Sequence, residues 1–167
     1  MGREVRRVPA GWQHPKNEEG QYIALLAADY EADLKDWMEQ KQHWDAGERS
    51  DFEGGWTPRV GEELTMPFHR WHGQCPDREE YMPIFPPGTA THLMMYETTS
   101  EGTPISPAFA TPEELAHWLA DNGASAFGDM TATYEEWLAT CKRGSAVSAV
   151  LSDNGMESGV AAEARLE

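Results

Sequence analysis

The stretch from residue 48 to residue 92 cannot form a long helix or strand, because prolines interrupt it throughout. These prolines are Pro58, Pro67, Pro76, Pro83, Pro86 and Pro87. Proline lacks a backbone N–H and restricts the residue before it, so each one tends to end a regular element. Gly54 and Gly55 add a further interruption early in the stretch. We therefore expect loops at residues 48–62 and 65–92, with regular elements only on either side.

Three helices are predicted from apolar spacing and capping residues. The first covers residues 29–46, and its apolar residues follow a 3.6-residue period: Tyr30, Leu34, Trp37, Met38 and Trp44. The second and third open with capping boxes at residues 111–114 (Thr-Pro-Glu-Glu) and 133–136 (Thr-Tyr-Glu-Glu). Gly123 and Gly144 stand where glycine commonly follows the end of a helix.

Short strands are predicted around these helices. They are residues 92–98, 105–109, 145–151 and 156–160, with turns at Ser100–Thr103 and Asp153-Asn154-Gly155. Strands and helices do not alternate as βαβ units, so the fold class is α+β, with a small antiparallel sheet packed with about three helices. We expect a single globular domain over residues 1–160 and a frayed tail at residues 161–167.

The net charge limits the partners. The chain carries 29 acidic and 13 basic side chains, a formal net charge of −16 over 167 residues. Such a field repels nucleic acid and anionic membrane and attracts a basic protein surface. The polar side of the first predicted helix supplies candidate partner-binding residues: Asp29, Glu31, Asp33, Asp36 and Glu39. The alternative is that this acidic side only keeps the protein in solution.

The only basic cluster lies near the N-terminus, at Arg3, Arg6 and Arg7. One interpretation is an arm that docks on an acidic surface such as the first predicted helix. The other is a solvated N-terminus or an edge strand with Val5 and Val8 pointing inward.

A possible metal site lies at His69-x-x-His72-x-x-Cys75. Histidine and cysteine are zinc ligands, and this spacing lets neighbouring side chains converge. A structural zinc site usually shows two paired motifs, whereas only one is present, so ordinary loop polarity is the alternative and no cofactor is expected. Cys141 lies on the apolar side of the third predicted helix, which favours an inert core thiol.

A ligand-binding loop is the second candidate site. The hydroxyl-rich turn near residue 100 has the composition of an anion-binding loop, although Glu101 opposes an anion. Aromatic residues of the proline-rich middle are candidates to line a groove: Trp56, Phe68, Trp71, Tyr81, Phe85 and Tyr96. The candidate ligand-binding residues are Trp71, Tyr96, Thr98, Thr99, Ser100 and Thr103. The alternatives are a hairpin turn that bonds its own backbone and a loop pinned on the core by its aromatic residues.

Compartment and membrane topology follow from simpler features. Two cysteines are too few for a disulfide framework, which favours the reducing cytoplasm. No stretch approaches the 18 or so consecutive apolar residues of a membrane span. No catalytic signature rises above background, so we expect binding rather than catalysis.

Two motifs resemble small uncharacterised proteins of bacteriophages and prophages. The first is REVRRVP at residues 3–9, followed by Trp12 and His14-Pro15. The second is YETTSEGTPISP at residues 96–107, followed by TPEEL at residues 111–115. The resemblance implies a phage origin, hence the host cytoplasm, but no activity and no site residues.

Three functions remain open. The first is an acidic accessory protein that binds a basic host protein and inhibits a defence or transcription factor by imitating nucleic acid. The second is a small-ligand binder of a nucleotide-like molecule, or a minor enzyme. The third is a component of the virion or of its assembly. A pocket with convergent polar groups would favour the second, and an exposed apolar patch the third.

Overall fold

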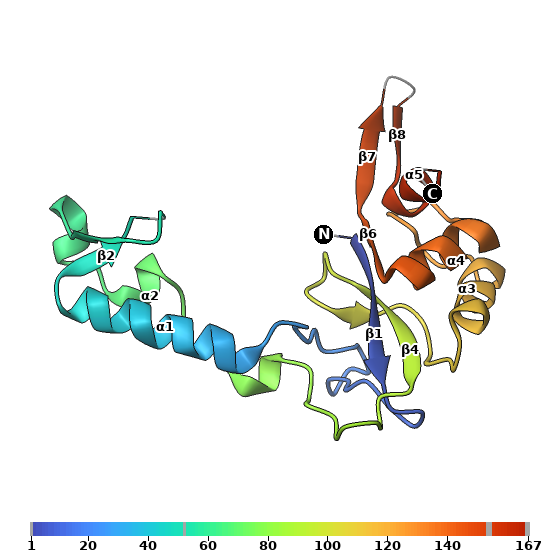
Figure 1. Cartoon of the computed structure of the whole chain (residues 1–167), viewed down its shortest axis with the longest axis horizontal. Coiled ribbons are helices and arrows are strands. Elements are labelled where there is room, and N and C mark those ends of the chain that lie inside the picture. Colours follow the sequence, from blue (N-terminus) through green and yellow to red (C-terminus); the bar gives the residue numbers. More distant parts are fainter. Residues whose placement is uncertain (1, 52, 153–154, 166–167) are drawn as a thin grey trace. The chain divides into compact units, whose positions relative to one another are not determined.

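The chain divides into two compact units in a computed structural model that describes residues 2–51, 53–152 and 155–165 (Figure 1). The first, here called the sheet unit, comprises Met1–Leu26 and Pro83–Glu167. The second, here called the aromatic unit, is Ala27–Met82. The predicted α+β class is confirmed, since helices accompany small antiparallel sheets. Each unit has buried side chains of its own, and the single domain over residues 1–160 stays a prediction.

The sheet unit is built on a four-stranded sheet in the order β5-β4-β1-β6, with every neighbouring pair antiparallel. Its strands are β1 (Gly2–Val8), β4 (His92–Glu97), β5 (Thr103–Pro104) and β6 (Ser145–Val147). The strand predicted at residues 105–109 is reduced to β5 and a single bridge between Leu93 and Phe109. Pro104 and Pro107 explain this, because neither can donate to the ladder.

Strand β1 lies inside the sheet, which corrects both interpretations of the basic N-terminus. Arg3 and Arg6 are buried. The Arg3 guanidinium pairs with Glu97 at 2.9 Å and donates to the Ser125 carbonyl at 2.8 Å. Val5 and Val8 cannot both face one side, because residues three apart on a strand point to opposite faces.

The two faces of this sheet are covered differently. Leu93 and Met95 of β4 point into the main apolar core, beneath α3 (Pro112–Asp121) and α4 (Tyr134–Arg143). Met94 and Tyr96 alternate with them and point to the other face. Hydrogen bonds that join the Tyr96 hydroxyl to the side chains of Trp12 and His14 place the N-terminal segment on that second face.

Helices α3 and α4 begin and end as predicted. The Thr111 and Thr133 hydroxyls accept from the N–H groups of Glu114 and Glu136, and the glutamate carboxylates accept in return. Gly144 ends α4 with φ near 100°, a left-handed conformation that favours glycine. Buried Leu115 and Leu119 of α3 pack in the core with Trp137 of α4.

The C-terminal part of the sheet unit departs from the prediction in two places. The strand expected at residues 145–151 is two strands, β6 and β7 (Ala149–Ser152), and β7 pairs with β8 (Gly155–Ser158) as a hairpin. The turn residues Asp153 and Asn154 lie outside the described residues. Helix α5 (Gly159–Ala164) replaces most of the expected frayed tail, because Ser158 caps it and Val160 is fully buried. Residues 166–167 are also outside the description.

The aromatic unit contains one long helix and short elements packed on it. They are α1 (Tyr30–Asp45), β2 (Glu48–Ser50), β3 (Trp56–Pro58), the 3-10 helix Gly61–Leu64, α2 (Phe68–Trp71) and the 3-10 helix Arg78–Glu80. Residues 48–58 therefore form a hairpin, and a 3-10 helix begins at Gly61, where the sequence predicts a loop over residues 48–62. The Asp51 carboxylate explains the hairpin, since it accepts hydrogen bonds from the N–H groups of Glu53 and Gly55.

A stack of arginine and tryptophan side chains holds the aromatic unit together. The Trp44 and Trp71 rings stack with centroids 5.5 Å apart. Arg59 lies 4.6 Å above the Trp44 ring, and Arg49 lies 5.6 Å from the Trp71 ring. Phe68 also packs against Trp44, with ring centroids 5.9 Å apart. Helix α1 matches its prediction except at Met38, whose side chain is 57% exposed instead of on the packed stripe.

Candidate functional site

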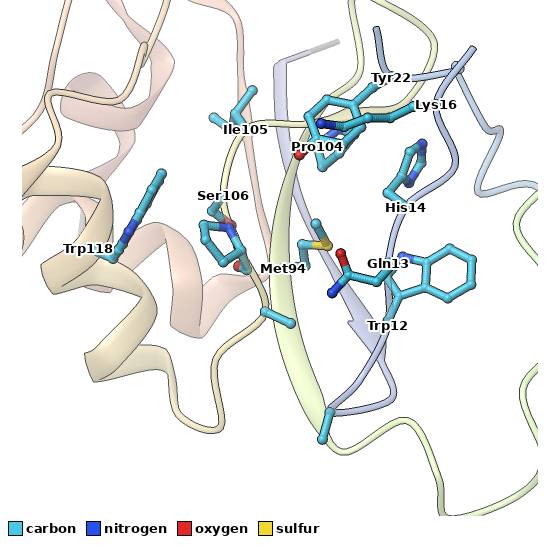
Figure 2. A pocket seen from close by; sticks show the side chains of 13 residues that line it. Trp12, Gln13, His14, Lys16, Tyr22, Met94, Pro104, Ile105, Ser106 and Trp118 are labelled. Atoms are coloured by element: carbon cyan, nitrogen blue, oxygen red, sulfur yellow. The ribbon is translucent and has the colours of Figure 1, made fainter. Parts of the chain in front are cut away.

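A cavity of about 840 Å³ opens on the sheet unit, bounded by the N-terminal segment, strand β4 and helix α3 (Figure 2). Its main side chains, here called the aromatic groove, are those of Trp12, Gln13, His14, Lys16, Tyr22, Met94, Ser106 and Trp118. Figure 2 shows Trp118 on one side of the segment that carries Pro104, Ile105 and Ser106. Trp12, His14 and Tyr22 lie on the other side. Aromatic rings therefore stand on both sides of this segment, which is itself part of the lining.

A chain of hydrogen bonds fixes the inner wall of the groove. The Trp12 indole N–H donates to the Tyr96 hydroxyl over 3.3 Å. Tyr96 Oη lies 3.1 Å from His14 Nδ1, and His14 Nε2 lies 2.6 Å from the Ile23 carbonyl oxygen. Because a carbonyl only accepts, Nε2 carries the proton, and Nδ1 is left to accept from Tyr96. Both ring nitrogens of His14 are thus bonded, in an arrangement that a neutral imidazole satisfies.

Burial supports this protonation state. It lowers the pKa of His14 below its usual value of 6.5, and the nearby Arg6 charge lowers it further, while the bond to Ile23 acts in the opposite direction. Burial also raises the pKa of Tyr96, so the phenol keeps its proton. The inner wall is therefore uncharged and already hydrogen-bonded.

Arg6 packs against the ring face of Tyr96. Its guanidinium lies 4.3 Å from the centre of the Tyr96 ring, donates to the Leu25 carbonyl at 2.5 Å and pairs with Glu4 at 3.0 Å. Gly102 packs directly against the Leu25 carbonyl and the Arg6 guanidinium, and a Cβ atom at this position would collide with both. Its φ is near 105°, a conformation that favours glycine. The 98–103 turn therefore contributes to the site as a structural support.

Three groups of the groove remain available to a ligand. Within the described residues, the Gln13 amide and the Trp118 indole N–H have no hydrogen-bond partner. The Lys16 ammonium lies 4.5 Å from the centre of the Tyr22 ring. None of the described residues that line the groove carries a carboxylate. This is a marked local exception in a chain with a net charge of −16.

The predicted ligand-binding residues are divided between the two units. Tyr96 is fully buried in the sheet unit and bonds Trp12 and His14 of the groove lining, whereas Trp71 lies in the aromatic unit. Thr98 bonds the backbone of Gly2, the Ser100 and Thr103 hydroxyls bond each other at 2.5 Å, and Thr99 is exposed. The Ser100 hydroxyl also donates to the Glu97 carbonyl oxygen at 3.2 Å, which is the kind of bond that the alternative of a self-bonded turn predicts. The predicted aromatic groove is likewise divided, since Trp56, Phe68, Trp71 and Tyr81 lie in one unit and Phe85 and Tyr96 in the other.

The predicted partner-binding acids differ in their surroundings. Asp29 caps α1, Asp33 accepts from the Tyr81 hydroxyl at 2.9 Å, and Asp36 lies 3.6 Å from His72. Glu31 and Glu39 are exposed, and neither has a side-chain partner among the described residues. Asp33 is therefore part of the internal packing, which its residue type alone did not indicate.

The structure does not bring His69, His72 and Cys75 together as metal ligands. His72 stacks on Phe68 with centroids 5.3 Å apart, and Cys75 is exposed. No group of three or more histidine, cysteine, aspartate or glutamate side chains is placed to hold a metal ion in the described part of the chain. Cys141 is buried, and burial raises its pKa to about 12, as expected of an inert thiol.

Sequence reasoning missed most of the groove. Its aromatic side chains come from segments far apart in the chain: Trp12, His14, Tyr22 and Trp118. The sequence analysis names only Trp12 and His14, as parts of a motif. The one available signal was an aromatic-rich segment at residues 12–22 with no periodicity, which indicates a loop pinned to a core rather than a site.

Comparisons with known proteins add no constraint to this picture. None of the helices in the described residues is long and apolar enough to cross a membrane. No family model, curated protein or solved structure matches the chain. The resemblance to phage proteins therefore stays a prediction.

Proposed function

We propose that the sheet unit is a binding module for a small, flat organic molecule, held in the aromatic groove. The observation that carries this proposal is a cavity lined by Trp12 and Trp118, with no carboxylate among its described lining residues. Ligand sites are typically concave and mostly apolar, with a few placed polar groups, and enclose roughly 300–1,000 Å³. The groove, at about 840 Å³, falls within that range.

Electrostatics narrows the class of ligand. A cation would gain no carboxylate partner in the groove and would compete with Lys16 for the Tyr22 ring. A strongly anionic ligand would be repelled by a chain of net charge −16. The groove therefore suits a neutral or weakly anionic ring system that stacks on aromatic side chains.

The groove is also preorganised. The hydrogen-bonded series from Trp12 through Tyr96 to His14 holds the inner wall before any ligand arrives. A preformed site does not spend binding energy on ordering its own side chains, so even a small ligand can bind measurably.

Ligand-observed NMR with a library of aromatic fragments tests the proposal. We expect neutral, flat fragments to bind the intact chain, and Trp118→Leu to weaken them by about fivefold, since stacking is worth about 1 kcal/mol. The matched control is Trp56→Leu, which removes a half-buried tryptophan of the aromatic unit. The proposal fails if no fragment binds, or if the two variants lose affinity equally.

Binding of a basic protein is a second candidate function, favoured by the aromatic unit. Residues 27–82 carry 14 acidic and 6 basic side chains, half of the net charge in a third of the chain. Six exposed acids there have no side-chain partner among the described residues: Glu31, Glu39, Glu53, Glu62, Glu79 and Glu80. Unpaired exposed charge is available to steer a partner of opposite sign. The partner is a host protein if the chain is phage-encoded, as the resemblance predicts.

Charge neutralisation tests this second candidate. A variant with these six glutamates changed to glutamine should lose a captured basic partner and most of the salt dependence of its association rate. The control variant neutralises exposed acids of the sheet unit, such as Glu18, Glu19 and Glu135, and should keep the partner. If both variants lose the partner equally, net charge alone explains the binding, and the proposal of a specific binding surface on the aromatic unit is wrong.

A further inference from the structure

We propose that the aromatic groove recognises a neutral nucleobase-type heterocycle, as a free base or nucleoside, and discriminates against its phosphorylated forms. This inference rests on the proposed function and names the ligand class of the same site. Three features carry it: a free amide edge, a free stacking surface and a lining whose described residues include only one cationic side chain, Lys16.

The Gln13 side chain supplies the free edge. A carboxamide presents a donor and an acceptor side by side, and it pairs with the donor–acceptor edge of a nucleobase in the same way that glutamine pairs with adenine in DNA recognition. Figure 2 shows the Gln13 amide beside Met94, inside the groove. Gln13 has no hydrogen-bond partner in the described chain.

The His14 and Ser106 side chains are already occupied, which leaves Gln13 as the one lining group that offers both a donor and an acceptor among the described residues. Both His14 nitrogens are bonded. The Ser106 hydroxyl accepts from the Met95 N–H at 2.9 Å and donates to the Pro107 carbonyl at 2.8 Å. A ligand with no hydrogen-bonding edge, such as a plain aromatic hydrocarbon, therefore leaves the amide unpaired when it enters.

Trp118 supplies the stacking surface. It is half-buried, and its ring meets Phe109 only at an angle, with centroids 6.2 Å apart. Its indole N–H has no partner in the described chain. Bases stack on aromatic side chains whatever their sequence, because every base has a flat face. Gln13 thus offers a hydrogen-bonding group for the edge of a base, and Trp118 offers a ring for its face. Unstacked bases are usually recognised by this combination.

The surroundings disfavour phosphate. Lys16 is the single cation among the described lining residues, and it is followed by Glu18 and Glu19. Arg6 is buried and engaged with Glu4 and Leu25, so it cannot reach a phosphate without breaking the support of Tyr96. Each added phosphate therefore brings negative charge toward a negative chain, and Lys16 alone among the described lining residues can offset it.

Titration calorimetry and ligand-observed NMR on the intact chain test this inference with four probes: adenine, adenosine, ATP and indole. We expect adenine and adenosine to bind, ATP to bind at least tenfold more weakly at low salt, and the difference to shrink at high salt. Indole should stack but bind more weakly than adenine, because it lacks the paired donor and acceptor.

The variant Gln13→Met isolates the edge. It should weaken adenine by roughly tenfold, the effect of one lost hydrogen-bonding group, and leave indole unchanged. Gln42→Met, at an exposed glutamine of α1, is the matched control and should change neither. Tighter binding of ATP than of adenosine, or a Gln13→Met variant that binds adenine normally, overturns the ligand class. If indole and other flat fragments also fail to bind, the proposed function itself falls.

Discussion

At the scale of single residues, His14 makes the stability of the sheet unit depend on pH. In the folded protein its pKa lies below 6.5, chiefly because it is buried, whereas in the unfolded chain it titrates near 6.5. The unfolded state therefore binds the proton more readily, and the free energy of unfolding should fall as the pH drops through 6.5 toward the lower folded pKa. Urea unfolding followed at pH 7.5, 6.5 and 5.5 measures this slope.

His14→Gln provides the comparison for that pH series. Glutamine still offers a donor toward Ile23 and an acceptor toward Tyr96, but it does not titrate. The variant should lose some stability at every pH and show a flatter dependence between pH 7.5 and 5.5. A slope as steep as that of the parent chain would assign the effect to other groups and contradict the neutral, buried His14.

At the scale of elements, the capping boxes of α3 and α4 make separable contributions. The Thr111 hydroxyl accepts from the Glu114 N–H at 3.2 Å, and the Thr111 N–H donates to the Glu114 carboxylate. Thr111→Ala should lower the free energy of unfolding by about 1 kcal/mol, the usual value of an N-cap. Thr131→Ala, at an exposed threonine outside any helix, should stay within about 0.5 kcal/mol. Equal losses in urea unfolding would show that the cap is not the cause.

The same elements show how far local sequence predicts structure. Helices α3 and α4 were predictable because a cap, an apolar period and a terminating glycine all lie within a few residues of one another. Strand β1 was not, since its place inside the sheet depends on β4, some 90 residues later, and on β6 beyond it. In the sequence, its arginines also look like those of a solvated basic arm, although Arg3 and Arg6 are buried. Their partners, such as Glu97 and Ser125, become visible only in the fold.

The groove was less predictable than the helices for a related reason. Its walls come from residues 12–22, β4, the 104–108 segment and α3, so no single window of sequence contains them. Proline, which correctly excluded long elements at residues 65–92, also shapes the groove at Pro104 and Pro107, where it ends the edge strand. The charge composition favoured an acidic binding surface instead of the groove, because acidic side chains dominate the chain but are missing from the described lining.

At the scale of the whole molecule, the division into two units predicts two separable unfolding events. Trp44 is 4% exposed and packs within the aromatic unit, against Arg59, Phe68 and Trp71. A tryptophan-to-alanine change in a core costs about 3–5 kcal/mol. A unit as short as Ala27–Met82 is marginally stable, so Trp44→Ala should unfold it at room temperature.

The sheet unit should remain folded in Trp44→Ala, because its core and the groove draw on its own residues. Indole N–H resonances report both units in one NMR spectrum. Those of Trp37, Trp56 and Trp71 should collapse to unfolded positions, while those of Trp12, Trp118 and Trp137 should keep their shifts. Fragments that bind the groove should still bind the variant, since binding is assigned to the sheet unit alone. Simultaneous collapse of all the resonances would show that the chain folds as one cooperative unit and that the groove depends on the whole of it.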